Sequence, residues 1–312
     1  MASPAAWSFT PLVSAFPTAV FPNIALWNAT SAAKNLTYQI EVSWPFGWES
    51  RDVGNKSALA MYVVDGNALG MTASEGFKRR LAVEPSQPDS VVVSIGYPLS
   101  DDVYSFARRA VDLRPPLPTP QTPPSGADEF IDFIDASLRP WIRSTLFPNV
   151  RFTRDALYGH SFGGLFVVYA LIARPDMFDT FLSASPALDW ANGSIFDMVS
   201  QRLGTGGDLP VFGSCGHGQN GTALSRPAVV ISYGSLEQFP VRRRAETEAA
   251  FQARKAIILS FSRMTDYCHE LFDRLKGSRR ARDVVLKEYL GQDHSSVAAS
   301  AVVDGIDYFV DW

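Results

Sequence analysis

Two stretches of the chain are largely apolar, and a third alternates. Residues 58–64 and 90–95 are short apolar runs, each closed by a turn sequence, Asp-Gly-Asn and Gly-Tyr-Pro respectively. Runs that are apolar on both faces are typical of parallel strands covered by helices on both sides. Residues 36–44 alternate apolar and polar side chains, the pattern of a half-buried strand. The first hundred residues therefore predict part of a sheet that lies inside the molecule.

The same pattern continues to the end of the chain, with apolar runs separated by stretches of helical periodicity. Further strands are expected at 156–158, 180–184, 228–232 and 283–289. Helices are expected at 71–81, 127–144, 164–173, 241–276 and 295–309. Strands that alternate with helices predict an α/β fold, with a mainly parallel sheet and helices on both faces.

Three segments do not follow this pattern, and none of them reads as a domain linker. Residues 1–35 are expected to be irregular, 113–126 to form a proline-rich surface loop, and 204–221 to form a glycine-rich insertion. Because the α/β pattern resumes after each interruption, we expect residues 1–312 to form a single domain. A chain of this length is compatible with one α/β domain.

Composition and charge argue against several classes of partner. The formal net charge is −4 and 46% of the residues are hydrophobic, with no strongly basic stretch. Nucleic acid and anionic membrane surfaces are therefore not expected as partners. No apolar run reaches the length of a transmembrane helix. The two cysteines, Cys215 and Cys268, cannot form a disulfide framework.

The location in the cell is suggested only weakly by the sequence. The first 30 residues contain no lysine or arginine and do not resemble a secretory signal, which favours a cytoplasmic protein. However, five asparagines occupy N-x-S/T sequons where about one would be expected by chance, which would suit a secreted glycoprotein. These asparagines are Asn28, Asn35, Asn55, Asn192 and Asn220.

The sequence Gly159-His-Ser-Phe-Gly163 fits the pattern G-x-S-x-G, in which the serine is a nucleophile on a tight turn. The bare pattern is weak evidence, because about one chain in seven of this length would contain it by chance. Here it lies between an expected strand and an apolar helix, the arrangement that presents a nucleophile. Its glycines avoid collisions in the tight turn. Ser161 is thus predicted to be a nucleophile, and an incidental serine in a glycine-rich turn is the alternative.

A serine nucleophile requires a base, and four histidines are available. In the α/β-hydrolase order the base follows the last strand, which is the position of His294. His160 adjoins the nucleophile and is expected to point elsewhere. His217 lies in the glycine-rich insertion and His269 on the expected long helix, so structural roles are expected for both.

The triad acid and the oxyanion hole follow from the same chain order. The acid should lie just beyond the strand that ends near Ser232, where Glu237 is found, and Asp266 is the fallback. The oxyanion hole should use the backbone amide of Phe162 and one from the loop after residues 58–64, at Gly66 or Asn67. An ordinary surface carboxylate and an ordinary turn are the alternative interpretations of Glu237 and of this loop.

With these residues in place, the chain resembles the esterase family that includes esterase D and the bacterial enterobactin-type siderophore esterases. Within it, the likeness is to the fungal branch of siderophore (triacetylfusarinine C) esterases. The segments that carry the resemblance are 63–67, 109–115, 138–142, 158–166, 174–178, 183–186, 233–238 and 291–297.

The resemblance implies a serine esterase of the α/β-hydrolase fold, with Ser161, His294 and Glu237 as its triad. It implies hydrolysis of a ferric hydroxamate siderophore through an acyl-enzyme, without a cofactor or catalytic metal. Arg109 is implied as a substrate contact, although a structural Arg–Asp pair is an equal alternative. After Ser185-Pro186 the chain departs from the relatives, which usually carry aromatic pairs there, and has Leu188-Asp189-Trp190 instead. Trp190 is assigned to substrate binding. A carboxylesterase or acyltransferase acting on another secondary-metabolite ester remains the alternative function.

Overall fold

One nine-stranded sheet runs through the computed structural model, which describes residues 7–11, 21–48, 53–99, 102–203 and 226–311. The strand order is β1-β2-β3-β5-β4-β6-β7-β8-β9, and the strands from β5 to β9 pair in parallel. The strands are β1 (Ser8–Pro11), β2 (Ile24–Ser31), β3 (Leu36–Ser43), β4 (Lys56–Val64), β5 (Asp89–Gly96), β6 (Val150–His160), β7 (Thr180–Ala184), β8 (Ala228–Gly234) and β9 (Asp283–Tyr289). The predicted α/β-hydrolase class is confirmed.

The sheet begins with an antiparallel part that the sequence interpretation missed. Strands β1, β2 and β3 pair antiparallel, and β3 joins β5. Residues 8–11 and 24–31 are therefore strands, although residues 1–35 were expected to be irregular. Strand β2 alternates only weakly, because just Trp27, Ala29 and Ser31 on one face are buried.

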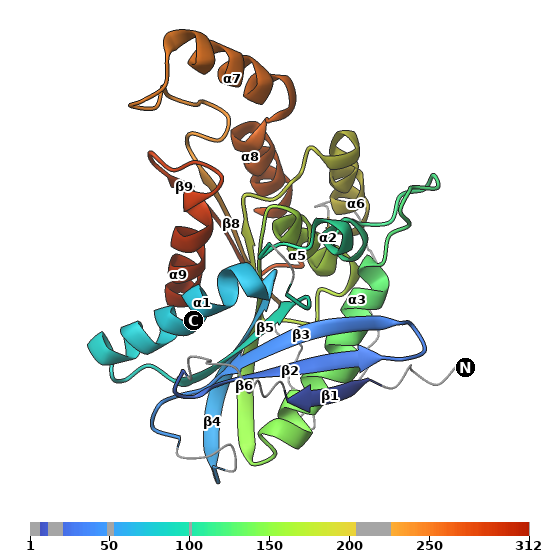
Figure 1. Cartoon of the computed structure of the whole chain (residues 1–312), viewed down its shortest axis with the longest axis vertical. Helices are drawn as coiled ribbons and strands as arrows, with labels where there is room; N and C mark the ends of the chain where they lie inside the picture. The colour runs from blue at the N-terminus through green and yellow to red at the C-terminus, as the bar shows by residue number, and fades with distance from the viewer. Residues whose placement is uncertain (1–6, 12–20, 49–52, 100–101, 204–225, 312) are drawn as a thin grey trace.

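Helices cover both faces of the sheet (Figure 1). Helix α1 (Gly66–Val83) packs beside α9 (Ser296–Asp311) on one face, where Phe77, Val302 and Phe309 belong to one apolar cluster. The second cluster, on the other face, includes residues of α3, α5, α6 and α8. These helices span Ala127–Phe133, Phe162–Ala173, Ser194–Leu203 and Met264–Leu275. Burial on both faces explains why β4 and β5 carry apolar runs, over residues 58–64 and 91–93.

The amphipathic stretch expected at 127–144 is helical but not a regular α-helix. After α3 it continues through the π-helical turns η1 (Ile134–Leu138) and η2 (Ile142–Leu146), with α4 (Arg139–Trp141) between them. Pro140 lies between the two π turns and has no backbone N–H to donate.

The long helix expected at 241–276 is instead two helices. They are α7 (Glu248–Phe261) and α8, separated at Ser262, whose backbone is extended. Only α8 carries a buried stripe, formed by Met264, Cys268, Leu271 and Leu275. Three further elements were not predicted: α2 (Phe106–Asp112), η3 (Trp190–Gly193) and α6.

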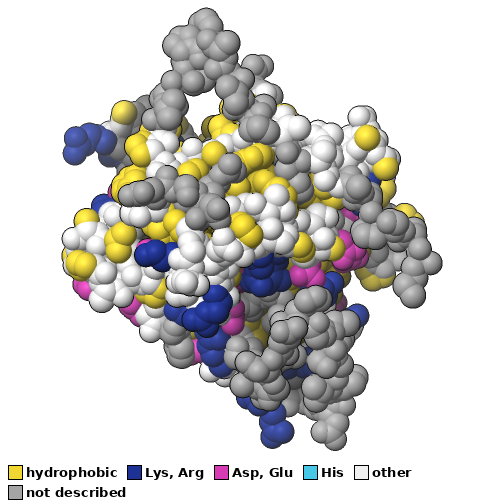
Figure 2. Space-filling model, turned by 90° about the horizontal axis from the view of Figure 1, so that it is seen from below, with side chains coloured by type: hydrophobic (Ala, Val, Ile, Leu, Met, Phe, Trp, Pro, Cys, Tyr) yellow, Lys and Arg dark blue, Asp and Glu magenta, His cyan; other side chains and the backbone are white. Residues whose placement is uncertain are grey.

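The end of the sheet where β6 and β7 begin is held by buried charges. The carboxylate of Asp155, which is only 2% exposed, forms ion pairs with Arg139 at 2.6 Å and with Arg143. Figure 2 looks at the molecule from below and shows basic side chains next to acidic ones on that face. The opposite ends of the parallel strands carry the residues predicted to be chemically active.

Candidate active site

Ser161 lies at the turn between β6 and α5, in a backbone conformation that L-residues rarely adopt. Its φ is 60° and its ψ is −118°. The turn is tight because a Cβ atom on Gly159 would lie 2.3 Å from the carbonyl oxygen of Gly163. A Cβ atom on Gly164 would lie 2.6 Å from the carbonyl oxygen of Ala184. The glycines of the motif therefore allow the strained serine to stand at the start of the helix.

Glu237 and His294 lie in contact. His294 Nδ1 lies 2.5 Å from Glu237 Oε2, and the carboxylate side chain is only 2% exposed. The other carboxylate oxygen, Oε1, accepts hydrogen bonds from the Ser185 hydroxyl at 2.6 Å and from the Gly234 amide at 2.7 Å. Three donors thus surround one buried carboxylate, an arrangement suited to orienting an imidazole.

Backbone hydrogen bonds join the loop of Glu237 to the loop of His294. The amides of Ser235 and Leu236 donate to the carbonyl oxygens of Tyr289 and Gln292, each at 3.0 Å. A Cβ atom on Gly234 would lie 2.4 Å from the Gln292 oxygen, so the two loops could not approach as closely with another residue there. The parallel pairing of β8 with β9 brings these two loops together.

His160 was expected to point away from the site, and the structure corrects this. Its ring lies against that of His294, with the centroids 4.5 Å apart. It is buried, and its pKa is lowered to about 3 by burial, by the neighbouring His294 and by Arg109. The neutral ring of His160 therefore packs against His294, next to the turn that carries Ser161. The only sequence signal for this contact is its place beside the nucleophile.

The amides predicted for the oxyanion hole lie at two helix starts. Phe162 is the first residue of α5, while Gly66 and Asn67 are the first two residues of α1. The first amides of a helix have no acceptor within the helix, so they are suited to a developing negative charge. A Cβ atom on Gly66 would lie 2.7 Å from the Ile95 nitrogen, so this loop packs directly on β5.

The side chain of Asn67 fixes this loop to the sheet. Its Nδ2 donates to Gln39 Oε1 and to the Tyr97 carbonyl oxygen, both at 3.0 Å. Its Oδ1 accepts from the Tyr97 amide at 2.7 Å. The side chain is thus occupied by β3 and by the end of β5, which leaves its backbone amide as the group suited to an oxyanion.

Arg109 is buried and paired with an aspartate that the sequence interpretation did not single out. Its Nε donates to Asp65 Oδ1 at 2.8 Å, and both side chains are less than a tenth exposed. Asp65 has a φ of 54° and precedes Gly66 directly. Burial raises the pKa of Asp65, and Arg109 opposes that shift. Asp112, the aspartate next to Arg109 in sequence, pairs with Arg108 instead.

The remaining predicted residues lie further from this cluster of contacts. Trp190 is partly buried at the start of η3, with the Arg114 guanidinium 5.8 Å from its ring centroid. Asp266, the fallback acid, pairs with Arg263 at 3.3 Å. His269 contacts the Tyr233 hydroxyl, and His217 lies outside the described residues.

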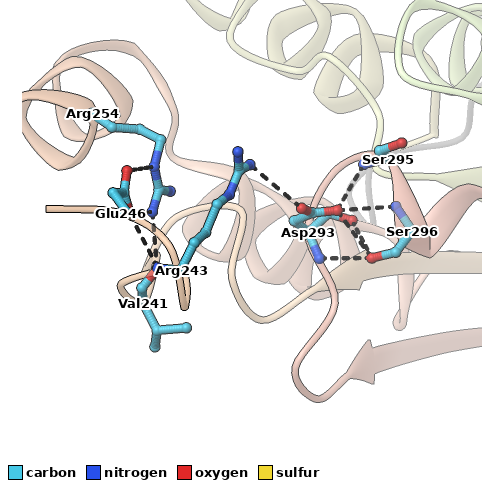
Figure 3. A network of polar contacts seen from close by, with 7 residues as sticks. All are labelled: Val241, Arg243, Glu246, Arg254, Asp293, Ser295 and Ser296. Atoms are coloured by element: carbon cyan, nitrogen blue, oxygen red, sulfur yellow. Dashed lines mark hydrogen bonds and ion pairs between the residues drawn. The ribbon is translucent and has the colours of Figure 1, made fainter. Parts of the chain in front are cut away.

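The residue before His294 is held by its neighbours and by a more distant arginine. Asp293 Oδ1 accepts from the amides of Ser295 and Ser296, and these bonds lower its pKa. Arg243, on the segment that leads to α7, lies 3.8 Å from the other oxygen of Asp293 (Figure 3).

Among the described residues, no group of three or more His, Cys, Asp or Glu side chains is arranged to hold a metal ion. No helix in the described ranges is long and apolar enough to cross a bilayer.

The fold, with a serine on a strained strand-to-helix turn and a carboxylate–histidine pair beyond β8 and β9, is that of an α/β-hydrolase. Residues 31–271 match the family described as "Putative esterase", and the chain belongs to this family. The resemblance found in the sequence is thereby confirmed.

Relatives of similar length agree with this assignment. The chain is 41% identical over 313 residues to the siderophore enterobactin esterase of Emericella nidulans, covering 96% of each chain. It is 37% identical to the siderophore triacetylfusarinine C esterase of Aspergillus fumigatus, covering 88% of this chain and 89% of the relative. Among solved structures, the siderophore hydrolase EstA from Aspergillus nidulans matches with a TM-score of 0.82 and 38% identity, over 98% of this chain and 99% of that one.

Proposed function

We propose that this protein is a serine esterase that hydrolyses the ester bonds of a ferric hydroxamate siderophore of the triacetylfusarinine C type. The observation that carries the catalytic part is the 2.5 Å contact between Glu237 and His294, next to the strained turn of Ser161. The substrate rests on the relatives, one of which is named for triacetylfusarinine C.

In the proposed mechanism, His294 removes the proton of Ser161 as its hydroxyl oxygen attacks the ester carbonyl. Glu237 holds the ring by Nδ1, so that Nε2 is the nitrogen that takes the proton, and stabilises the imidazolium that forms. The amides of Phe162 and of the Gly66–Asn67 loop receive the oxyanion. His294 then protonates the leaving alcohol, and a water molecule activated by the same histidine releases the acid from Ser161.

The proposed roles of Arg109 and Trp190 rest on different observations. The pairing of Arg109 with Asp65 supports a role in holding the oxyanion loop, while its position next to the site is compatible with contact to a substrate carbonyl. Trp190 offers an aromatic surface beyond β7 that a bulky ester could contact. The proposed substrate is thus a small molecule, and Ser161 is the proposed nucleophile for its esters.

A second substrate class is favoured by a specific observation, the name of the relative that is 41% identical. Enterobactin is likewise a cyclic triester, but its iron is held by catecholates. The two classes share the chemistry at Ser161 and differ only in the groups around the ester.

The test is to incubate the purified protein, and Ser161→Ala beside it, with ferric triacetylfusarinine C or ferric enterobactin and to follow the products by mass. Stepwise loss of fusarinine units with the parent alone is expected. Cleavage of enterobactin only would move the assignment to the catecholate. If neither siderophore were cleaved while a simple aryl ester was still turned over, the siderophore substrate would be wrong and the serine esterase would stand.

A further inference from the structure

A four-residue segment after β7, residues 184–187, contacts both the nucleophile and the acid. The Ser161 amide donates to the Ala184 carbonyl oxygen at 3.0 Å, and the Ala187 amide donates to the Ser161 carbonyl oxygen at 3.1 Å. Between these two bonds, the hydroxyl of Ser185 donates to Glu237 Oε1 at 2.6 Å. One short segment therefore fixes the turn of Ser161 through its backbone and holds Glu237 through a single side chain.

Ser185 is held in place more firmly than an ordinary loop serine. It is fully buried, and its φ of 40° lies in the left-handed region that L-residues seldom occupy. Its amide donates to the Ser232 carbonyl oxygen at 2.7 Å, which ties it to the end of β8. A strained conformation of this kind persists only where the surrounding structure fixes it, and such positions cluster at functional sites.

The hydroxyl of Ser185 determines how the Glu237 carboxylate lies. Its two oxygens face different partners, with Oε2 against His294 and Oε1 against Ser185 and the Gly234 amide. Without the hydroxyl, Oε1 would keep the Gly234 amide alone, and the carboxylate plane could turn. Because the ring of His294 takes its direction from this carboxylate, a turn of the plane would move the nitrogen that faces Ser161.

We propose that Ser185 is a positioning residue that orients Glu237 and, through it, the base His294. The inference rests on the proposed function, because Ser185 can have this positioning role only if Glu237 and His294 are the acid and the base. Ser185 does not itself contact the substrate, since it is fully buried and its hydroxyl is already engaged.

The first test compares Ser185→Ala and Ser185→Gly with the parent. Both variants lack the hydroxyl, but glycine also accepts the left-handed backbone, so the pair separates lost positioning from backbone strain. For an aryl ester, we expect kcat to fall about ten- to a hundredfold in both, with KM within about twofold. The rate at which a fluorophosphonate labels Ser161 should fall with kcat.

Ser183→Ala is the matched control. Its hydroxyl is also buried and also makes one hydrogen bond, at 2.9 Å, but to the Gly164 carbonyl oxygen and not to the acid. This variant should keep kcat near that of the parent even if its melting temperature falls. If Ser183→Ala lost as much activity as Ser185→Ala, the effect would be one of packing and the proposal would be overturned.

The decisive measurement adds Glu237→Ala. In that background the Ser185 hydroxyl has no acid to orient, so Ser185→Ala should lower kcat no further. An equal loss with and without Glu237, or a Ser185→Gly variant as active as the parent, would overturn the positioning role. A parent enzyme whose Ser161 is not labelled, or a Glu237→Ala variant as fast as the parent, would instead show that the proposed triad is wrong.

Discussion

At the scale of single residues, the buried charges around the site determine how the protein responds to pH. His160 is kept neutral, because burial, the neighbouring His294 and Arg109 lower its pKa to about 3. On β3, burial raises the pKa of Glu41 to about 7, and Lys78 opposes that shift only in part. The first residue makes the fold sensitive to acid, and the second makes it sensitive to alkali.

We expect His160→Phe to weaken the acid sensitivity of the fold. The unfolded chain binds a proton at the ordinary histidine pKa of 6.5, whereas the folded chain does so only near 3. Stability from the neutral ring is therefore present above 6.5 and is lost on acidification, at roughly 1.4 kcal/mol per pH unit. Between pH 7 and pH 5, the variant should lose about 2 kcal/mol less of its unfolding free energy than the parent.

Urea unfolding at the two pH values measures this difference. His269→Phe is the control, because that histidine lies exposed on α8. An equal pH dependence in the parent and in His160→Phe would show that His160 is not held neutral in the fold.

Glu41→Gln should have the opposite effect. The folded pKa of Glu41 is about 7 against an ordinary value of 4.5, so its contribution to stability is complete below 4.5 and is lost as the pH rises to 7. Gln cannot ionise, so relative to the parent the variant should gain up to about 2 kcal/mol between pH 5 and pH 8. Urea unfolding at both pH values checks this, with the exposed Glu84→Gln expected to show no such gain.

At the scale of elements, the loop proposed to form the oxyanion hole is held at the start of α1 from two sides. Asn67 fixes it to β3 and to the end of β5, and the pair of Arg109 with Asp65 fixes it to α2. Both anchors act on residues next to Gly66, which itself packs against β5. The position of two amides is thus set by three separate elements.

We expect Arg109→Gln to destabilise the fold by about 3 kcal/mol, because it leaves the buried carboxylate of Asp65 without its charged partner. Adding Asp65→Asn should recover part of this loss, since the unpaired buried charge is removed. Unfolding free energies of the parent, the two single variants and the double variant measure the coupling. A higher KM for the ester with unchanged stability would instead support Arg109 as a substrate contact.

The helices and strands could be predicted from the sequence where the pattern of buried residues follows the periodicity of a helix or a strand. Strand β7, which is buried at every position, begins and ends as expected. The break between α7 and α8 was not predictable, because neither Gly nor Pro marks it. It is fixed by tertiary contacts of Ser262, whose hydroxyl donates to the Glu237 carbonyl oxygen at 3.2 Å.

The residues of the candidate site were likewise predictable only in part. Ser161, His294 and Glu237 could be named because chain order and position after a strand select them. Ser185, His160 and Asp65 could not, because their roles arise from segments far apart in sequence that meet only in the fold. Their common feature is burial of a polar group next to a positive φ or beside the site, which no local pattern reveals.

At the scale of the whole molecule, one helix stands apart from the packed layers. Helix α7 lies at one end of the molecule, beyond the strands β8 and β9 that lead to Glu237 and His294 (Figure 1). None of its side chains described over 248–260 is buried, and Ile257 and Leu259 are about half exposed or more. It is held mainly at its start, where Arg254 pairs with Glu246 at 2.7 Å and the preceding Arg243 lies near Asp293 (Figure 3).

We therefore expect that replacing residues 242–260 with a short Gly-Ser linker leaves the fold nearly as stable, because little apolar surface is lost from the core. The melting temperature should change by no more than a few degrees. Activity should depend on substrate size: a small aryl ester should be hydrolysed at the parent rate, since Ser161, Glu237 and His294 lie outside the replaced segment. We expect a bulky siderophore ester, unlike a small aryl ester, to contact α7 as well as the catalytic residues, so its KM should rise several-fold. Equal KM changes for both esters would show that α7 takes no part in binding bulky substrates, and a collapse of the melting temperature would show that α7 belongs to the folded core.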